Sequence, residues 1–120
     1  MNTILIIDDN DLFCGMLKQL LENEGYDVIV ASEGNSGIKQ FQENKPDLVI
    51  CDIIMPEKEG LETITVLQNI DNKTPIIAVS GGGRVGPEMY LELAETMGAR
   101  YTFTKPFVNK EFLQAVAECL

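Results

Sequence analysis

The chain has 120 residues, of which 45% are hydrophobic and 23% are charged, and its 19 acidic and 9 basic residues give a net charge of −10. This composition is ordinary for a globular protein, the length suits one domain over residues 1–120, and the negative charge argues against direct binding to nucleic acid or an anionic membrane. Histidine is absent, which excludes histidine metal sites and histidine-activated nucleophiles.

Short apolar runs alternate along the chain with segments of helical periodicity. Residues 3–7 (TILII) predict a strand that is buried on both faces. Residues 11–25 predict a helix that Asp11 caps and Gly25 ends. Its apolar side chains fall at helical spacing and are expected to face inward: Phe13, Met16, Leu17, Leu20 and Leu21. The alternation continues with strands at 27–31, 47–51, 75–79 and 101–103 and helices at 35–44, 60–70, 87–97 and 109–120.

Five strand–helix units in succession, with fully apolar strands, favour an α/β fold in which helices cover both faces of a parallel sheet. We expect a doubly wound, flavodoxin-like (βα)5 arrangement with the strand order 2-1-3-4-5. In such sheets the ligand lies beyond the carboxyl ends of the strands, where the strand order reverses. Here that point is between the first and third strands.

Three carboxylates are expected to meet at this point. Asp8 and Asp9 follow the first strand, and Asp52 follows the third. Three carboxylates in one pocket repel one another unless a cation compensates them. Because oxygen ligands suit hard divalent ions, the pattern predicts a site for Mg²⁺, with Mn²⁺ as an alternative.

Two further polar residues stand at neighbouring strand ends. Ser80 follows the fourth strand and Lys105 the fifth. A hydroxyl and an ammonium group can both hold a phosphoryl oxygen. Asp52 is then a candidate nucleophile, since an aspartate can accept a phosphoryl group and form an acyl phosphate.

The chain resembles the receiver domain of response regulators, the phosphorylation module of two-component signalling, with a fold like that of the chemotaxis regulators. The resemblance covers essentially all 120 residues. Its most specific motif is the D-x-x-M-P run from Asp52 to Pro56, followed by Gly60. The motifs that carry it are ILIIDDN (4–10), DLVICDIIMPEKEG (47–60), PIIAVSG (75–81) and TKPF (104–107).

By this resemblance, Asp52 is the phosphoacceptor. Mg²⁺ is bound directly by Asp9, through water by Asp8, and by Asp52 and the backbone carbonyl of Ile54. Ser80 contacts the phosphoryl group and reports its arrival, and Lys105 pairs with a phosphoryl oxygen.

The resemblance also assigns structural roles to Gly60 and to Pro106, which is expected to follow a cis peptide bond from Lys105. The family usually has an aromatic residue three places before the lysine, but this chain has Thr102 there. Switching therefore uses either position 102 without an aromatic ring or a rearrangement of the glycine-rich loop at 80–87.

The resemblance implies a phosphohistidine donor on a sensor histidine kinase or phosphotransfer protein, which small phosphodonors can replace. The chain is then a signalling switch that assists its own phosphorylation and dephosphorylation rather than an enzyme. Phosphorylation changes the surface around the fourth and fifth helices, which controls an output protein, and the resemblance allows a phosphorylation-dependent dimer. Because the chain begins with Met1, we expect a stand-alone regulator or the N-terminal part of a longer protein.

Localisation is expected to be cytoplasmic. No apolar run approaches the ~20 residues that span a bilayer, and no signal peptide is recognisable. The cysteines Cys14, Cys51 and Cys119 are odd in number and widely spaced, which favours reduced thiols.

Three alternatives share parts of this pattern. The first is a receiver-like protein-binding module that is not phosphorylated. The second is a metal-dependent phosphatase, which needs a second aspartate where this chain has Ile54. The third is a flavodoxin-like FMN carrier, which needs a hydroxyl-rich loop after the first strand, where this chain has Asp8, Asn10 and Asp11.

Overall fold

Strands and helices alternate over residues 3–80, as the sequence predicts. The computed structural model describes residues 2–53, 60–80, 92, 95–96 and 98–120, so most of the predicted helix at 87–97 and the loop before it lie outside the described residues. None of the helices within these ranges is long and apolar enough to cross a membrane. The elements are β1 (Thr3–Ile7), α1 (Asp11–Asn23), β2 (Asp27–Ala31), α2 (Gly34–Asn44), β3 (Leu48–Asp52), α3 (Gly60–Ile70), β4 (Ile76–Ser80), β5 (Tyr101–Thr104) and α5 (Asn109–Cys119).

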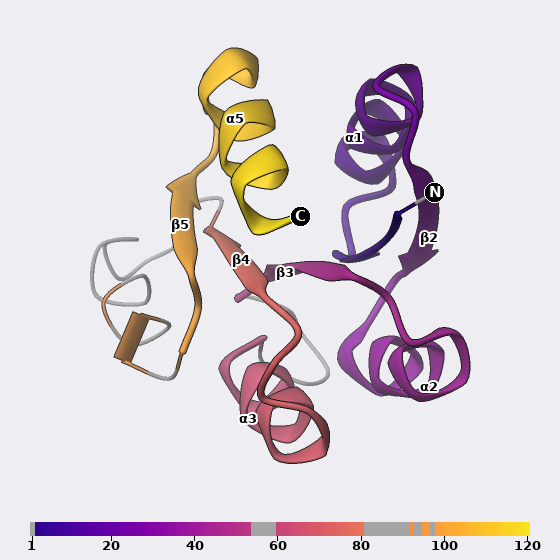
Figure 1. Cartoon of the computed structure of the whole chain (residues 1–120), viewed down its shortest axis with the longest axis vertical. Helices are drawn as coiled ribbons and strands as arrows, with labels where there is room; N and C mark the ends of the chain where they lie inside the picture. Colours follow the sequence, from indigo (N-terminus) through magenta and orange to yellow (C-terminus); the bar gives the residue numbers. More distant parts are fainter. Residues whose placement is uncertain (1, 54–59, 81–91, 93–94, 97) are drawn as a thin grey trace.

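The five strands form one sheet in the order β2-β1-β3-β4-β5, and every neighbouring pair is parallel (Figure 1). This confirms the predicted fold class and strand order. The order reverses between β1 and β3, because β2 pairs with one edge of β1 and the next strand, β3, pairs with the other edge. The carboxyl ends of β1 and β3 therefore lie side by side.

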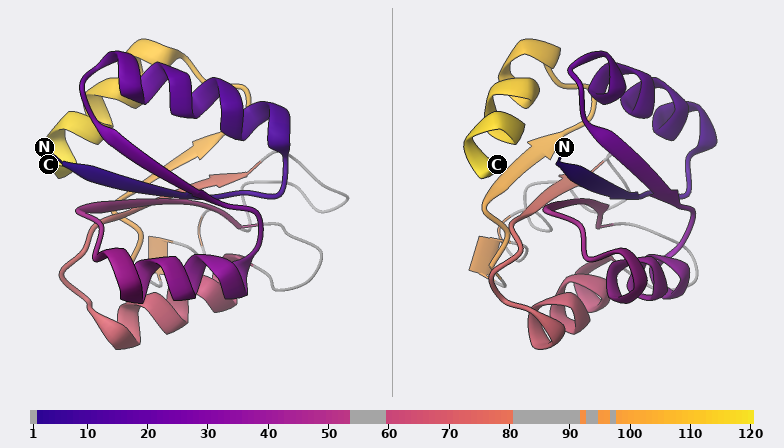
Figure 2. Two further views of the ribbon diagram at one scale, coloured as in Figure 1. Left: turned by 90° about the vertical axis from the view of Figure 1, so that its right-hand side faces the viewer. Right: turned by 45° about the vertical axis from the view of Figure 1, so that its right-hand side comes forward.

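Helices cover both faces of the sheet. Successive strand residues point to opposite faces, so Ile4 and Ile6 of β1 pack beneath α1 and α5, whereas Leu5 and Ile7 pack against α2 and α3. Figure 2 shows the two helical layers on either side of the sheet. All four side chains are fully buried, which explains why the strand sequence is apolar without alternation.

β3 and β4 begin and end one residue later than predicted. Asp52 pairs with Val79 in the sheet, and Ser80 pairs with Thr104. Both polar residues are thus the last members of their strands rather than the first residues of a loop. The ladder of backbone hydrogen bonds extends to them and fixes their backbone positions.

Two details of α1 differ from the prediction. The cap is Asn10, whose side chain accepts a hydrogen bond from the backbone N–H of Phe13, and Asp11 is the first helical residue. Met16 was expected to face inward but is 52% exposed, because the buried face of the helix runs through Cys14, Leu17 and Leu21. The helix ends at Asn23, near the predicted stop at Gly25, whose φ of 94° suits glycine.

Candidate functional site

Asp8 is held in place by the segment that joins β1 to α1. Its backbone N–H donates to the carbonyl of Ala31 (3.0 Å), and its Oδ1 accepts from the backbone N–H of Asn10 (2.9 Å). The Cys14 thiol donates to the Asp8 carbonyl at 3.2 Å. The Asp8 side chain is fully buried, whereas Asp9 is exposed at the rim.

Asp52 completes an acidic cluster with Asp8 and Asp9. One carboxylate oxygen from each residue lies within 4.8 Å of the other two. Asp52 itself is only 5% exposed. The parallel strands β1 and β3 bring these residues together, so the predicted convergence at the carboxyl ends of the strands is present.

Lys105 reaches into the cluster from the segment after β5. Its Nζ lies 2.6 Å from Oδ2 of Asp8 and 3.6 Å from Oδ2 of Asp52. The backbone N–H of Lys105 donates to the carbonyl of Ser80 at 2.7 Å, which ties this segment to the end of β4. The Lys105–Pro106 peptide bond is cis, as the resemblance implied.

Ser80 ends β4, next to the end of β3, and places a hydroxyl group in the interior. The residue is fully buried, and within the described part of the chain no hydrogen-bond partner lies in reach of its Oγ. A buried hydroxyl without a hydrogen-bond partner lowers the stability of the folded state by about 1–3 kcal/mol. A group that arrives at the end of β4 with an acceptor oxygen would recover that cost.

The acidic cluster suits a divalent cation. Three carboxylates face one ammonium group, so the charges of these four side chains sum to −2. The donor atoms are all oxygens, two of the three residues are buried, and the exposed Asp9 leaves room for water ligands. This donor set fits Mg²⁺ or Mn²⁺ and not a thiolate- or imidazole-seeking metal. The proposed fourth ligand, the carbonyl of Ile54, lies outside the described residues.

Gly60 allows the start of α3 to approach the end of β3. A Cβ atom at this position would lie 2.0 Å from the carbonyl oxygen of Asp52 and 2.2 Å from the Cα of Ile53. Both are backbone atoms that cannot turn away. The glycine that follows the D-x-x-M-P motif is therefore required by close packing behind Asp52.

Thr102 does not replace the missing aromatic residue. It is half-buried and pairs with Ala78 in the sheet, on the face that α2 and α3 cover. Tyr101 packs on the opposite face, as strand alternation predicts, and its hydroxyl donates to the Glu118 carboxylate of α5. Neither side chain brings an aromatic ring to the acidic cluster.

Two residues near the cluster were not recognised as site residues from the sequence. The ring of Phe13 lies beneath the Lys105 ammonium group, with Nζ 4.0 Å from the ring centroid. Cys14 contacts the backbone of Asp8, and burial together with the Asp8 charge raises the pKa of its thiol from 9.0 to about 12. The sequence alone indicates only that Phe13 lies on the apolar face of a helix and that Cys14 is a reduced thiol.

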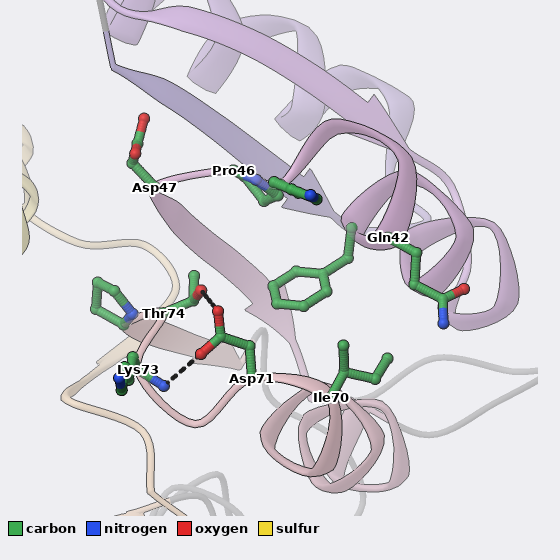
Figure 3. A pocket seen from close by; sticks show the side chains of 10 residues that line it. Gln42, Pro46, Asp47, Ile70, Asp71, Lys73 and Thr74 are labelled. Atoms are coloured by element: carbon green, nitrogen blue, oxygen red, sulfur yellow. Dashed lines mark hydrogen bonds between the residues drawn. The ribbon is translucent and has the colours of Figure 1, made fainter.

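A hollow of about 640 Å³ lies at the edge of the sheet opposite the acidic cluster, where α2 and α3 end. The carboxylates that line it accept hydrogen bonds from nearby backbone and side-chain groups. Asp71 accepts hydrogen bonds from the Lys73 backbone N–H and the Thr74 hydroxyl (Figure 3), and Asp47 accepts from the backbone N–H of Thr3. These contacts explain both carboxylates as structural, so we assign no chemistry to this hollow.

Comparison with known proteins gives one consistent family. The family model described as "Response regulator receiver domain" matches residues 4–117. The chain is 33% identical over 120 residues to the transcriptional regulatory protein CpxR of Escherichia coli, covering all of this chain and 50% of that protein. It is 29% identical over 117 residues to the chemotaxis protein CheY of Halobacterium salinarum, covering 98% and 95% of the two chains.

Solved structures agree with this result. A response regulator receiver domain protein from Clostridium thermocellum superposes with a TM-score of 0.91 at 29% identity, over 99% of this chain and 94% of that one. The chain spans about half the length of the first curated relatives that it matches.

Proposed function

The chain belongs to the response regulator receiver family, and from this premise we propose that it accepts a phosphoryl group on Asp52 from a phosphohistidine donor. The observation that carries the proposal is the meeting of three kinds of group at one edge of the sheet. Asp8, Asp9 and Asp52 supply the carboxylates, Lys105 an ammonium group, and Ser80 a buried hydroxyl without a partner in the described part of the chain.

Asp52 acts as the nucleophile. One of its carboxylate oxygens forms a bond to phosphorus while the bond between phosphorus and the imidazole nitrogen of the donor breaks. The electron pair of the broken bond stays with the imidazole nitrogen. The product is an acyl phosphate on Asp52. The step needs positioning and charge neutralisation more than proton transfer, which agrees with the absence of histidine.

Asp8, Asp9 and Asp52 would hold Mg²⁺, with the Ile54 carbonyl as a further ligand; Mn²⁺ is an alternative. When bound, the ion neutralises the charge that gathers on the phosphoryl oxygens. The residues of the chain contribute the remaining stabilisation. Lys105 donates to one phosphoryl oxygen, and the Ser80 hydroxyl donates to another and so gains a partner that the described residues do not supply.

The acquisition of a partner by Ser80 is the proposed trigger of the switch. Ser80 ends β4 and is the first residue of the glycine-rich loop predicted at 80–87, so a pull on its hydroxyl would act on that predicted loop and on the helix predicted after it. A ligand shifts a conformational equilibrium only through interactions that differ between the two states, and this hydrogen bond is one. We propose that the surface around the fourth and fifth helices changes and controls an output protein, without an aromatic residue at Thr102.

The proposed partners are a sensor histidine kinase or phosphotransfer protein and an output protein. The relative CpxR is a transcriptional regulatory protein, but this chain spans only half of it, and its net charge of −10 does not favour direct contact with DNA. We further propose that residues 1–120 act as one receiver domain in the cytoplasm, where the free thiols Cys14 and Cys51 stay reduced. Dimerisation on phosphorylation and assisted hydrolysis of the acyl phosphate belong to the same proposal.

The test is intact-mass measurement after incubation with a small phosphodonor, with and without Mg²⁺. The wild type is expected to gain one phosphoryl group only when Mg²⁺ is present. Asp52→Asn is expected to gain none, and Asp27→Asn, the same substitution at an exposed residue far from the cluster, is expected to behave as wild type. Normal labelling of Asp52→Asn would refute the acceptor. A wild type that binds Mg²⁺ but gains no mass from several donors or a histidine kinase would favour a binding module that is not phosphorylated.

A further inference from the structure

The ring of Phe13 is an uncharged neighbour of the Lys105 ammonium group. The Nζ atom lies 4.0 Å from the ring centroid, close enough for the electron-rich face to attract the cation. The same Nζ is 2.6 Å from an oxygen of Asp8 and 3.6 Å from an oxygen of Asp52. Two carboxylates and one aromatic face therefore define where the ammonium group lies.

The position of Phe13 is itself well fixed. Its backbone N–H donates to the side chain of Asn10 at 3.0 Å, in the segment that also carries Asp8 and Asp9. Its ring meets the Phe107 ring edge to face, with centroids 5.9 Å apart, and Phe107 stacks on the fully buried Phe112 at 4.5 Å. The aromatic face is thus anchored to α1 on one side and to the core beneath α5 on the other.

The three attractions respond differently when the site is used. A cation bound at Asp8 weakens the pull of that carboxylate on Lys105, because its charge is then shared. The Phe13 ring is neither charged nor a ligand for a hard metal ion, so its attraction remains. Cation–π attraction persists out to about 6 Å from the centroid, so the ammonium group can move toward a phosphoryl group on Asp52 without leaving the ring.

We propose that Phe13 is a positioning residue that keeps the Lys105 ammonium group beside Asp52 when Asp8 no longer holds it. This inference rests on the function proposed above. Phe13 touches neither the phosphoryl group nor the metal and acts through Lys105 alone.

The first test uses the metal-free protein without a phosphodonor. In the wild type, the ε-methylene protons of Lys105 should show an upfield ring-current shift by NMR, which Phe13→Tyr keeps and Phe13→Leu loses. In a double-mutant cycle on urea unfolding, Phe13→Leu and Lys105→Met should be non-additive by a factor of about four in the unfolding equilibrium constant. An additive cycle with unchanged Lys105 resonances in Phe13→Leu would overturn the contact.

The second test measures the initial rate of phosphorylation by a small phosphodonor at saturating Mg²⁺. Phe13→Leu should be about four-fold slower than wild type, and Phe13→Tyr, which keeps an aromatic face, should lie within about two-fold of it. Equal rates for wild type and Phe13→Leu would overturn the inference while leaving the proposed function intact. A wild type that gains no phosphoryl group under any condition would instead overturn the proposed function.

Discussion

Replacement of Lys105 by methionine removes the positive charge from the acidic cluster and keeps most of the aliphatic side chain. At an effective dielectric constant of about 20, unit charges 2.6 Å apart, the Nζ–Oδ2 distance to Asp8, attract by about 6 kcal/mol before desolvation is counted. Asp8 is fully buried, whereas the Lys105 side chain retains 15% exposure, so the net loss lies at the low end of values for broken buried pairs. We expect Lys105→Met to lower the free energy of unfolding by about 3 kcal/mol in metal-free buffer.

Added Mg²⁺ should reverse most of this loss, because the ammonium group and the metal neutralise the same carboxylates. If about 2 kcal/mol is recovered, linkage requires the variant to bind Mg²⁺ about thirty-fold more tightly than the wild type. Urea unfolding across a Mg²⁺ titration measures both quantities. Lys110→Met, the same substitution at an exposed residue of α5, is the control. Equal stability of Lys105→Met and Lys110→Met without metal, or equal Mg²⁺ affinity of wild type and Lys105→Met, would refute the reasoning.

Three further predictions follow from single observations at the site. Ser80→Ala removes a buried hydroxyl that has no partner in the described structure, so the unphosphorylated variant should be as stable as wild type or up to about 1 kcal/mol more stable. The same variant should show smaller chemical-shift changes than wild type when a phosphodonor is added. A clear loss of stability in urea unfolding would contradict this. Gly60→Ala should lose about 3 kcal/mol in urea unfolding because its Cβ would meet backbone atoms, whereas Gly15→Ala, with nothing within 4 Å, should be neutral or stabilising. The raised pKa of Cys14, about 12 against 9.0, means that the folded protein keeps a proton that the unfolded chain loses above pH 9, so this thiol should leave stability unchanged below that pH and add about 1.4 kcal/mol per pH unit to the slope with which stability falls toward pH 12. Burial also raises the pKa of Cys51, so Cys14→Ala should reduce this slope without abolishing it.

The fold could be predicted because its strongest signals are local. The run at residues 3–7 is apolar at every position, and the structure shows why: its side chains pack alternately into two helical layers. Once strands and helices alternate, the strand order limits which carboxyl ends can meet. The meeting of Asp8, Asp9 and Asp52 follows from this topology, since each residue stands at the end of its strand.

The remaining features depend on three-dimensional detail that spacing does not encode. Asp11 and Asn10 are both acceptable caps, and the turn after Asp8 selects Asn10. Met16 shares helical spacing with buried residues, but the apolar arc of α1 is wider than the part of the helix that the sheet covers. The contact of Phe13 with Lys105 joins residues 92 positions apart and depends on where the first turn of α1 meets the segment after β5.

The central claim is that Asp52 is the residue that carries the phosphoryl group. Hydroxylamine converts an aspartyl phosphate into an aspartyl hydroxamate, which tandem mass spectrometry can locate within the chain. After phosphorylation in Mg²⁺ and treatment with hydroxylamine, we predict a single hydroxamate, at Asp52. A hydroxamate at Asp8, Asp9 or any other acidic residue in place of Asp52 would contradict the account, as would a phosphoryl group that hydroxylamine leaves in place.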